Sequence, residues 1–233
     1  MAGRKAVVLL SGGLDSATTL ALAHDRGFEL YAMSFRYGQT HEVELDCARA
    51  QAHSFGVREH IVLEVDLGKI GGSRLVRDSR RPAVTDSPIP ATYVPARNTL
   101  FLSFALGWAE VLEADTIFIG VNAVDYSGYP DCRPEFIKAF ENMARLATRA
   151  GSEGRAGVSV AAPLIDMSKG EIVKLALSLK VDPGRTHSCY FPDTDGRPCG
   201  ACESCALRRR GFEEAGLRDP AQMPRRPRRL ETS

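Results

Sequence analysis

A short string near the start of the chain, SGGLDS at residues 11–16, has the composition of a phosphate-binding turn. It lies between an apolar run and a helical pattern, so its backbone N–H groups should meet at a helix N-terminus. Free donors and the positive end of the helix dipole favour an anion there, and Gly12 and Gly13 allow close approach. The string is neither a Walker A loop nor a GxGxxG turn. We predict a phosphate or pyrophosphate site, the alternative being an ordinary turn capped by Asp15 and Ser16.

Four of the six cysteines, Cys189, Cys199, Cys202 and Cys205, form the pattern C-x9-C-x2-C-x2-C. Two-residue spacers let neighbouring thiolates converge on one ion, and four thiolates fill the tetrahedral shell of zinc. Because no coordination position stays open, we expect one structural zinc ion per subunit. An iron–sulfur cluster is the alternative that this spacing allows.

Composition limits the class of protein. The chain has 233 residues, is 44% hydrophobic and carries a net charge of +1. This suits one large domain, or a domain with an appendage, and gives no case for nucleic acid as a partner. No apolar stretch approaches the roughly 18 residues of a membrane span. Residues 1–5 lead directly into a strand pattern, so we expect no signal peptide, a cytoplasmic location, and cysteines that bind metal rather than form disulfides.

Strand-like and helix-like segments alternate along most of the chain. Apolar runs predict strands at residues 6–10, 29–35, 60–65, 116–121 and 158–161, and helical patterns predict helices at residues 17–25, 42–55, 99–112, 134–149 and 169–179. Apolar strands separated by helices indicate an α/β fold with a doubly wound parallel sheet. Because ligands bind at the carboxyl ends of such strands, residues 11–16, 35–41 and 120–131 should share one site.

Three regions divide the chain. Residues 1–186 form the predicted α/β domain, and residues 187–218 form a zinc-binding loop and helix packed on it. Residues 219–233 include PRRPRR, which we interpret as a disordered basic tail rather than a nucleic-acid contact. Residues 68–96 form a long polar connection, a length typical of a functional or mobile loop.

Residues 11–16 resemble the N-type ATP pyrophosphatase (PP-loop) superfamily, whose signature is SGGxDS. The strings FRYGQTH, YVPARNTLFLS, GVNAVDYSGYPDCRPEF, APLIDMSKGEI, HSCY and CGACESCALRRRGFEEAG extend the resemblance, over residues 5–216, to the 7-cyano-7-deazaguanine synthase family. The family usually has glycine where this chain has Ala96, so a need for positive φ there would require a different local loop. It also usually has Glu-Thr in place of Ala123 and Val124, which could alter contacts to the base.

The resemblance implies an ATP-dependent ligase that converts 7-carboxy-7-deazaguanine and ammonia to 7-cyano-7-deazaguanine through adenylated intermediates, in queuosine-precursor biosynthesis. It implies an adenine nucleotide alpha-hydrolase-like ATP-binding domain, Mg²⁺ bound with ATP, and a homodimer. One alternative is another PP-loop adenylating enzyme, such as a tRNA thiolase or a deazaguanine-to-protein ligase, but the near-neutral charge disfavours a tRNA enzyme. A non-enzymatic zinc-ribbon module would leave the complete α/β domain unexplained.

The predicted site residues form three groups besides the cysteines. The ATP-binding group is Leu10, Ser11, Gly12, Gly13, Leu14, Asp15, Ser16, Ala17, Thr18, Thr19 and Leu20. The catalytic group is Asp15, Arg97, Lys169 and His41. The substrate-binding group is Gln39, Asn98, Tyr126 and Asp131.

Physical reasons accompany four of these assignments. Asp15 should act through Mg²⁺ or as a cap, since two anions repel each other. Arg97 and Lys169 can neutralise phosphate charge, with a surface ion pair as the alternative for each. Asp131 can accept hydrogen bonds from the N–H edge of a deazaguanine, with a turn cap as its alternative. A structural role is the alternative for His41.

Overall fold

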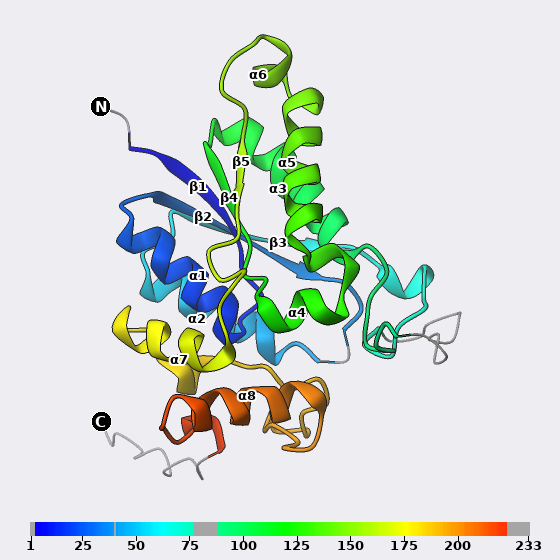
Figure 1. Cartoon of the computed structure of the whole chain (residues 1–233), viewed down its shortest axis with the longest axis vertical. Helices are drawn as coiled ribbons and strands as arrows, with labels where there is room; N and C mark the ends of the chain where they lie inside the picture. Colours follow the sequence, from blue (N-terminus) through cyan, green and yellow to red (C-terminus); the bar gives the residue numbers. More distant parts are fainter. Residues whose placement is uncertain (1–2, 40, 77–87, 223–233) are drawn as a thin grey trace, which may run out of the picture.

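The computed structural model describes residues 3–39, 41–76 and 88–222. Its centre is a sheet in which all neighbouring strands are parallel, in the order β3-β2-β1-β4-β5. The strands are β1 (Lys5–Leu9), β2 (Glu29–Arg36), β3 (Glu59–Glu64), β4 (Thr116–Phe118) and β5 (Ser159–Ala161) (Figure 1). The predicted doubly wound sheet is confirmed.

Helices cover both faces of this sheet, which explains why the strands are apolar throughout. Ala6 and Val8 of β1 pack with α1 (Leu14–Asp25) and α2 (Val43–Ser54). Val7, between them, packs with α3 (Arg97–Leu112) and α5 (Pro134–Ala147) on the opposite face. Successive side chains of a strand point to opposite faces, so two apolar layers require a continuous apolar run.

The C-terminal helices close one end of the domain. α7 (Lys169–Ser178) and α8 (Glu203–Glu214) lie side by side in Figure 1 and share an apolar cluster with α1. The helix expected in the predicted zinc-binding region is α8, which includes Cys205. Two helices, α4 (Ala123–Gly128) and α6 (Arg149–Ser152), were not predicted, because helices this short show no 3.6-residue pattern.

Short 3-10 turns complete the described chain: η1 (Leu67–Lys69), η2 (Pro130–Cys132), η3 (Pro183–Arg185) and η4 (Pro220–Gln222). Asp219 is buried and paired with Arg208 at 2.8 Å. The folded part therefore includes residues 219–222, which the sequence analysis had placed in the tail. The PRRPRR string and residues 77–87 of the long connection lie outside the described residues.

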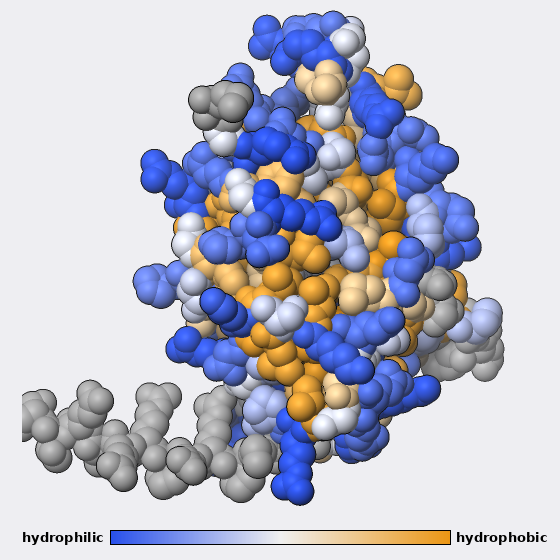
Figure 2. Space-filling model, turned by 60° about the vertical axis from the view of Figure 1, so that its left-hand side comes forward, coloured by the Kyte–Doolittle hydropathy of each residue, from blue (hydrophilic) through white to orange (hydrophobic). Residues whose placement is uncertain are grey.

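The surface of the described chain is mixed in character. Figure 2 shows apolar residues gathered in a band over the middle of one face, bordered by hydrophilic residues. Apolar atoms make up a large share of any protein surface, so this band alone defines no site. No helix of the described residues is long and apolar enough to cross a membrane.

Candidate active site

The strand order reverses between β1 and β4, and this switch point is where open α/β sheets bind ligands. A cavity of about 290 Å³ opens there. As predicted, the segments that follow β1, β2 and β4 all contribute to its wall. We call the part formed by Ser11, Gly13–Ser16 and Lys169 the phosphate side. The part with Tyr37, Tyr93, Phe101, Tyr129 and Tyr190 is the aromatic side.

The glycine-rich loop has the backbone of an anion site. Gly12 has a φ of +88°, and a Cβ atom there would lie 2.0 Å from the carbonyl oxygen of Glu44. Gly13 is the N-cap of α1 and provides no side-chain cap, so the first-turn amides of the helix stay available to a ligand. The hydroxyls of Ser11 and Ser16 lie 3.0 Å apart beside these amides. A phosphate group therefore finds backbone donors, hydroxyls and a helix dipole together.

The predicted ATP-binding residues divide into two sets. Leu10, Ser11 and the residues from Gly13 to Ser16 line the cavity. Gly12 lies behind the loop, where its carbonyl accepts hydrogen bonds from the rest of the fold. The remaining four, Ala17, Thr18, Thr19 and Leu20, do not line the cavity, because they are fully buried within α1. They support the loop from behind.

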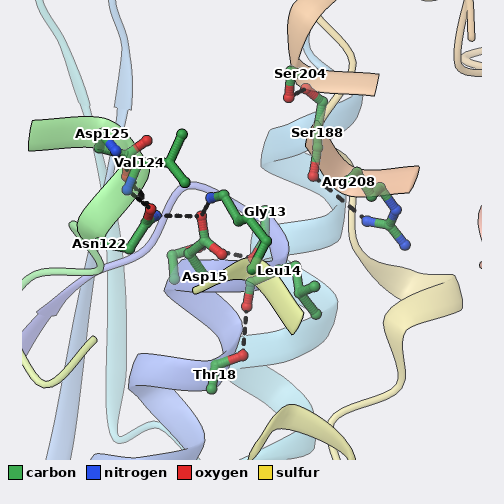
Figure 3. A network of polar contacts seen from close by, with 12 residues as sticks. Gly13, Leu14, Asp15, Thr18, Asn122, Val124, Asp125, Ser188, Ser204 and Arg208 are labelled. Atoms are coloured by element: carbon green, nitrogen blue, oxygen red, sulfur yellow. Dashed lines mark hydrogen bonds and ion pairs between the residues drawn. The ribbon is translucent and has the colours of Figure 1, made fainter. Parts of the chain in front are cut away.

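Asp15 is the centre of a charged network on the phosphate side. Its carboxylate accepts hydrogen bonds from Lys169 Nζ at 2.6 Å and from Asn122 Nδ2 at 3.2 Å. Asn122 also donates to Asp125 at 2.6 Å, so one amide links two carboxylates (Figure 3). Lys169 forms a partly buried ion pair with Asp15 rather than the surface pair considered as its alternative.

Local sequence explains how Lys169 reaches Asp15. Ser168 and Glu171 form the predicted capping box, which starts α7 at Lys169. Two glycines then let α7 lie directly on α8. A Cβ on Gly211 would lie 2.8 Å from Lys169 Cβ, and one on Gly170 would lie 2.7 Å from Glu214 Cβ.

Burial and neighbouring charges set the protonation of this network. Burial raises the pKa of Asp125 to about 6, with Lys169 opposing and Asp15 adding to the shift. Burial alone would lower the pKa of Lys169, but Asp15 and Asp125 outweigh it and raise that pKa. Lys169 is therefore a permanent cation at neutral pH, and the carboxylates beside it are oxygen ligands of the type that Mg²⁺ binds.

Arg97 begins α3 and lines the aromatic side, where its guanidinium lies 5.9 Å from the ring centre of Tyr37. Burial would lower the pKa of Arg97, but Tyr37, Cys132 and Asp131 raise it overall. In the described part of the chain, its guanidinium forms no ion pair with a carboxylate. The surface ion pair considered as its alternative is absent there, and Arg97 is available to an anion.

Ala96, immediately before Arg97, has a φ of +54°. We expected that a requirement for positive φ would force the loop away from the family geometry. Instead, the alanine occupies the left-handed region that a glycine would adopt more easily. This conformation strains an L-residue with a Cβ.

Asp131 and Asn98 hold each other in place. Asp131 Oδ2 accepts the backbone N–H of Asn98 at 2.8 Å, and the Asn98 side chain donates to the Asp131 carbonyl at 3.1 Å. Both line the cavity and both are buried. Asp131 thus caps the start of α3, which is a different structural role from the turn cap considered as its alternative. Neighbouring Cys132 is a neutral thiol, because burial raises its pKa to about 12.

Gln39 and His41 line the cavity beyond β2. Gln39 accepts the N–H of Tyr37 at 2.7 Å and donates to the carbonyl of Phe35 at 3.2 Å, which closes the turn. The His41 ring lies 5.0 Å from that of His187 in an edge-on arrangement. The side chain of Tyr126 lies outside those that the structure describes.

Several cavity residues were not predicted from the sequence: Glu44, Asp125, Tyr129, His187 and Tyr190. The same is true of Asn122, which is fully buried behind the cavity wall. The backbone N–H of His187 donates to the Gly12 carbonyl at 3.0 Å, which joins the cysteine region to the glycine-rich loop. Asn122 and Asp125 stand in the string already matched at residues 120–136, so their position could have been inferred. Glu44 is one of several charged residues in the predicted helix 42–55, and nothing in the sequence distinguishes it from the exposed ones.

The four predicted cysteines converge. Their sulfur atoms all lie within 4.8 Å of one another, and those of Cys189 and Cys202 lie 4.0 Å apart. Backbone N–H groups of Phe191 and Cys199 point at the Cys189 sulfur at 3.3 and 3.2 Å. Such contacts stabilise thiolates, so the donor set fits a tetrahedrally bound metal ion.

Arg208 of α8 connects this cluster to the domain. It forms two hydrogen bonds to Asp219 at 2.8 and 3.0 Å, donates to Thr186 at 2.7 Å, and reaches Ser188 at 3.5 Å. Ser204 donates to the Ser188 carbonyl at 2.5 Å. Figure 3 shows the part of this contact chain that joins Ser204, Ser188 and Arg208. The cysteine region therefore supplies part of the cavity wall.

A doubly wound parallel sheet with this loop at its switch point is an adenine nucleotide alpha-hydrolase-like fold of the PP-loop class. The solved NMN synthetase from Francisella tularensis has a similar fold, with a TM-score of 0.51 and 15% identity over 93% of this chain and 79% of that one. The family model described as "Queuosine biosynthesis protein QueC" matches residues 5–216. The chain belongs to this family.

Curated relatives are similar over nearly their whole length. A protein from Syntrophus aciditrophicus is 59% identical over 94% of this chain and 96% of its own length. One from Geotalea daltonii is 61% identical over 93% of this chain and 95% of its own length. Both bear the name 7-cyano-7-deazaguanine synthase.

Proposed function

We propose that the protein is an ATP-dependent carbon–nitrogen ligase that makes 7-cyano-7-deazaguanine from 7-carboxy-7-deazaguanine and ammonia. The observation that carries this proposal is the phosphate loop at the switch point of a chain 59–61% identical to relatives with that name. The carboxylate is first adenylated and displaced by ammonia, and the resulting amide is adenylated again and loses AMP to give the nitrile.

The phosphate side supports the adenylation steps. Amides of α1, with the hydroxyls of Ser11 and Ser16, bind the pyrophosphate portion of ATP. Lys169, held by Asp15, neutralises charge that develops on the departing pyrophosphate. Asp15 and Asp125 are the residues that would hold Mg²⁺, which supplies further charge neutralisation when it is bound with ATP.

The aromatic side supports binding of the deazaguanine. Flat rings of Tyr37, Phe101 and Tyr129 suit a planar base, and Arg97 supplies the cation for its carboxylate. Asn98, Gln39, Asp131 and Tyr126 remain our proposed recognition residues, although one Asp131 oxygen already caps α3.

We propose that Cys189, Cys199, Cys202 and Cys205 hold one zinc ion whose role is structural. Four sulfur ligands leave no position for water or substrate. Cysteines that are not paired in disulfides fit a reducing compartment, so we assign the protein to the cytoplasm.

We also propose a homodimer, which the family resemblance implies. Val111 and Leu146 are 79% and 85% exposed, and the Glu110 carboxylate accepts the N–H of Arg149 at 2.6 Å, so these helix ends lie together. Two large exposed apolar side chains at neighbouring helix ends are the part of the described surface that we assign to the contact with a second copy. Light scattering should report twice the chain mass, and a double variant with Val111→Glu and Leu146→Glu should be monomeric. A monomeric wild type would contradict the dimer.

One incubation tests the activity. Purified protein with ATP, ammonium and 7-carboxy-7-deazaguanine should yield the nitrile by mass spectrometry, together with AMP and pyrophosphate. ADP and phosphate without AMP would contradict adenylation. Release of AMP and pyrophosphate only with a tRNA or protein acceptor would indicate another PP-loop enzyme.

A further inference from the structure

Glu44 is a carboxyl group in the cavity to which no role has been assigned so far. It lies in the first turn of α2, is half-buried, and faces the cavity beside Tyr37, Gln39 and Arg97. Its main chain lies against the phosphate loop, because its carbonyl occupies the place that a Cβ on Gly12 would need. The glycine that shapes the loop thus also seats Glu44 next to it.

The carboxyl of Glu44 is able to exchange a proton near neutral pH. Burial raises its pKa to about 7, while Arg97 and Gln39 act in the opposite direction. Among the described residues it forms no ion pair with a cation. The other titratable groups that line the cavity are Asp15, Asp125, Asp131, Lys169, Arg97, Arg208, His41, His187, Cys132, Tyr37, Tyr93, Tyr129 and Tyr190.

The proposed reaction needs a proton acceptor at nitrogen. Ammonia has three N–H bonds and the nitrile has none, so three protons leave the nitrogen in each turnover. Lys169 is protonated and Cys132 is a neutral thiol, so neither serves. Asp15 is engaged by Lys169 and Asn122, and Asp131 by the start of α3.

We propose that the Glu44 carboxylate is the general base that removes these protons, a proposal that rests on the proposed function. In the first half-reaction, the ammonia lone pair forms the C–N bond, one proton passes to Glu44, and AMP leaves with the C–O bonding pair. In the second, the amide oxygen takes AMP from another ATP and pyrophosphate leaves. Two protons then pass in turn from nitrogen to Glu44 as the C–O bond breaks and the nitrile forms. After each transfer, the carboxyl releases its proton to water.

The decisive variant is Glu44→Gln, which keeps the shape of the side chain and one acceptor oxygen but accepts no proton. Adenylation is measured separately, as pyrophosphate exchange into ATP that depends on 7-carboxy-7-deazaguanine. We expect exchange to stay within about threefold of wild type and nitrile formation to fall about 10²- to 10⁴-fold, the usual size of general-base catalysis. The matched control is Glu42→Gln, two residues away and exposed, which should change neither rate.

Two further measurements separate proton transfer from binding. In the wild type, kcat/KM for nitrile formation should rise with pH through about 7, the value to which burial raises the pKa of Glu44. Glu44→Asp should restore part of the activity lost in Glu44→Gln.

Several outcomes overturn the inference. If Glu44→Gln forms the nitrile at the wild-type rate, Glu44 is not the base, and the proposed function is unaffected. An equal loss of exchange and of nitrile formation would assign Glu44 to binding instead. If Glu44→Gln does not fold, the pH profile of wild-type kcat/KM decides instead. A profile that shows no ionisation near pH 7 overturns the inference. A wild type that exchanges pyrophosphate but forms no nitrile overturns the proposed function as well.

Discussion

The two sides of the cavity prepare for their ligands in different ways. On the phosphate side, Lys169 and Asp15 are already paired at 2.6 Å, and Asn122 ties them to Asp125. On the aromatic side, Arg97 and Glu44 line the same wall without an ion pair to a described partner. The two charges of an ion pair stabilise each other before any ligand binds. A buried charged group without an ion-pair partner gains that stabilisation only when a ligand of opposite charge binds beside it. The phosphate side is built to hold a geometry, and the aromatic side to receive an anion and exchange protons.

The largest effect should come from the cysteine region, which contributes His187 and Tyr190 to the cavity wall. Cys202→Ser should remove the metal and destabilise the protein by several kcal/mol, because metal binding supplies folding free energy to a loop with few apolar residues. Elemental analysis and a melting curve measure this. Cys47→Ser, a cysteine outside the cluster, should keep both metal and melting temperature.

Two results would contradict this prediction. If elemental analysis finds iron and acid-labile sulfide, the cysteines hold an iron–sulfur cluster and the zinc assignment is wrong. If the Cys202→Ser protein has the wild-type melting temperature but is inactive, the role of the metal is not structural.

Breaking the matched pair should be the next largest effect. Lys169→Met leaves Asp15 and Asp125 facing each other without their cation, and kcat/KM for ATP should fall about 10²- to 10³-fold. The pKa of Asp125 should rise further, since Lys169 holds it down. Lys174→Met, on the exposed side of the same helix, is the control. Equal kinetics in the two variants would show that the pair is not needed for turnover.

Removing a single hydroxyl from the phosphate side tests it more gently. Ser11→Ala and Ser16→Ala should each lower kcat/KM for ATP about tenfold, because a charge-assisted hydrogen bond contributes about 1.5–3 kcal/mol. Circular dichroism should remain unchanged, and Ser54→Ala at the exposed C-terminal end of α2 should have wild-type kinetics. If neither variant loses activity, the loop does not bind pyrophosphate through its hydroxyls.

The smallest effect concerns the strained residue on the aromatic side. Ala96→Gly should raise the free energy of unfolding by about 0.5–1 kcal/mol, because glycine adopts the positive φ without the Cβ clash. Urea denaturation measures the change. Ala91→Gly in the same connection is a control that gains nothing, since Ala91 is not among the described residues with positive φ. Destabilisation by Ala96→Gly would mean that the alanine side chain has a packing role.

The linear sequence determined the parallel sheet, the phosphate loop and the four-cysteine cluster. Each depends on neighbours in the chain: apolar runs buried on both faces, Gly12 and Gly13 between a strand and a helix, and thiolates two residues apart. The predicted end of the folded part, residue 218, is too early. Asp219 is buried because it pairs with Arg208 on the preceding helix, and the sequence does not reveal that contact.

Only the tertiary structure decided which charges meet. Asp15 and Lys169 are 154 residues apart in the chain and become partners because α1 and α7 pack together through a shared apolar cluster. Asp131 is both a cavity residue and the cap of α3, a choice set by the distance to Asn98. Glu44 enters the site because Gly12 leaves room for its main chain. Contacts between distant segments depend on packing in three dimensions, and no spacing along the chain records them.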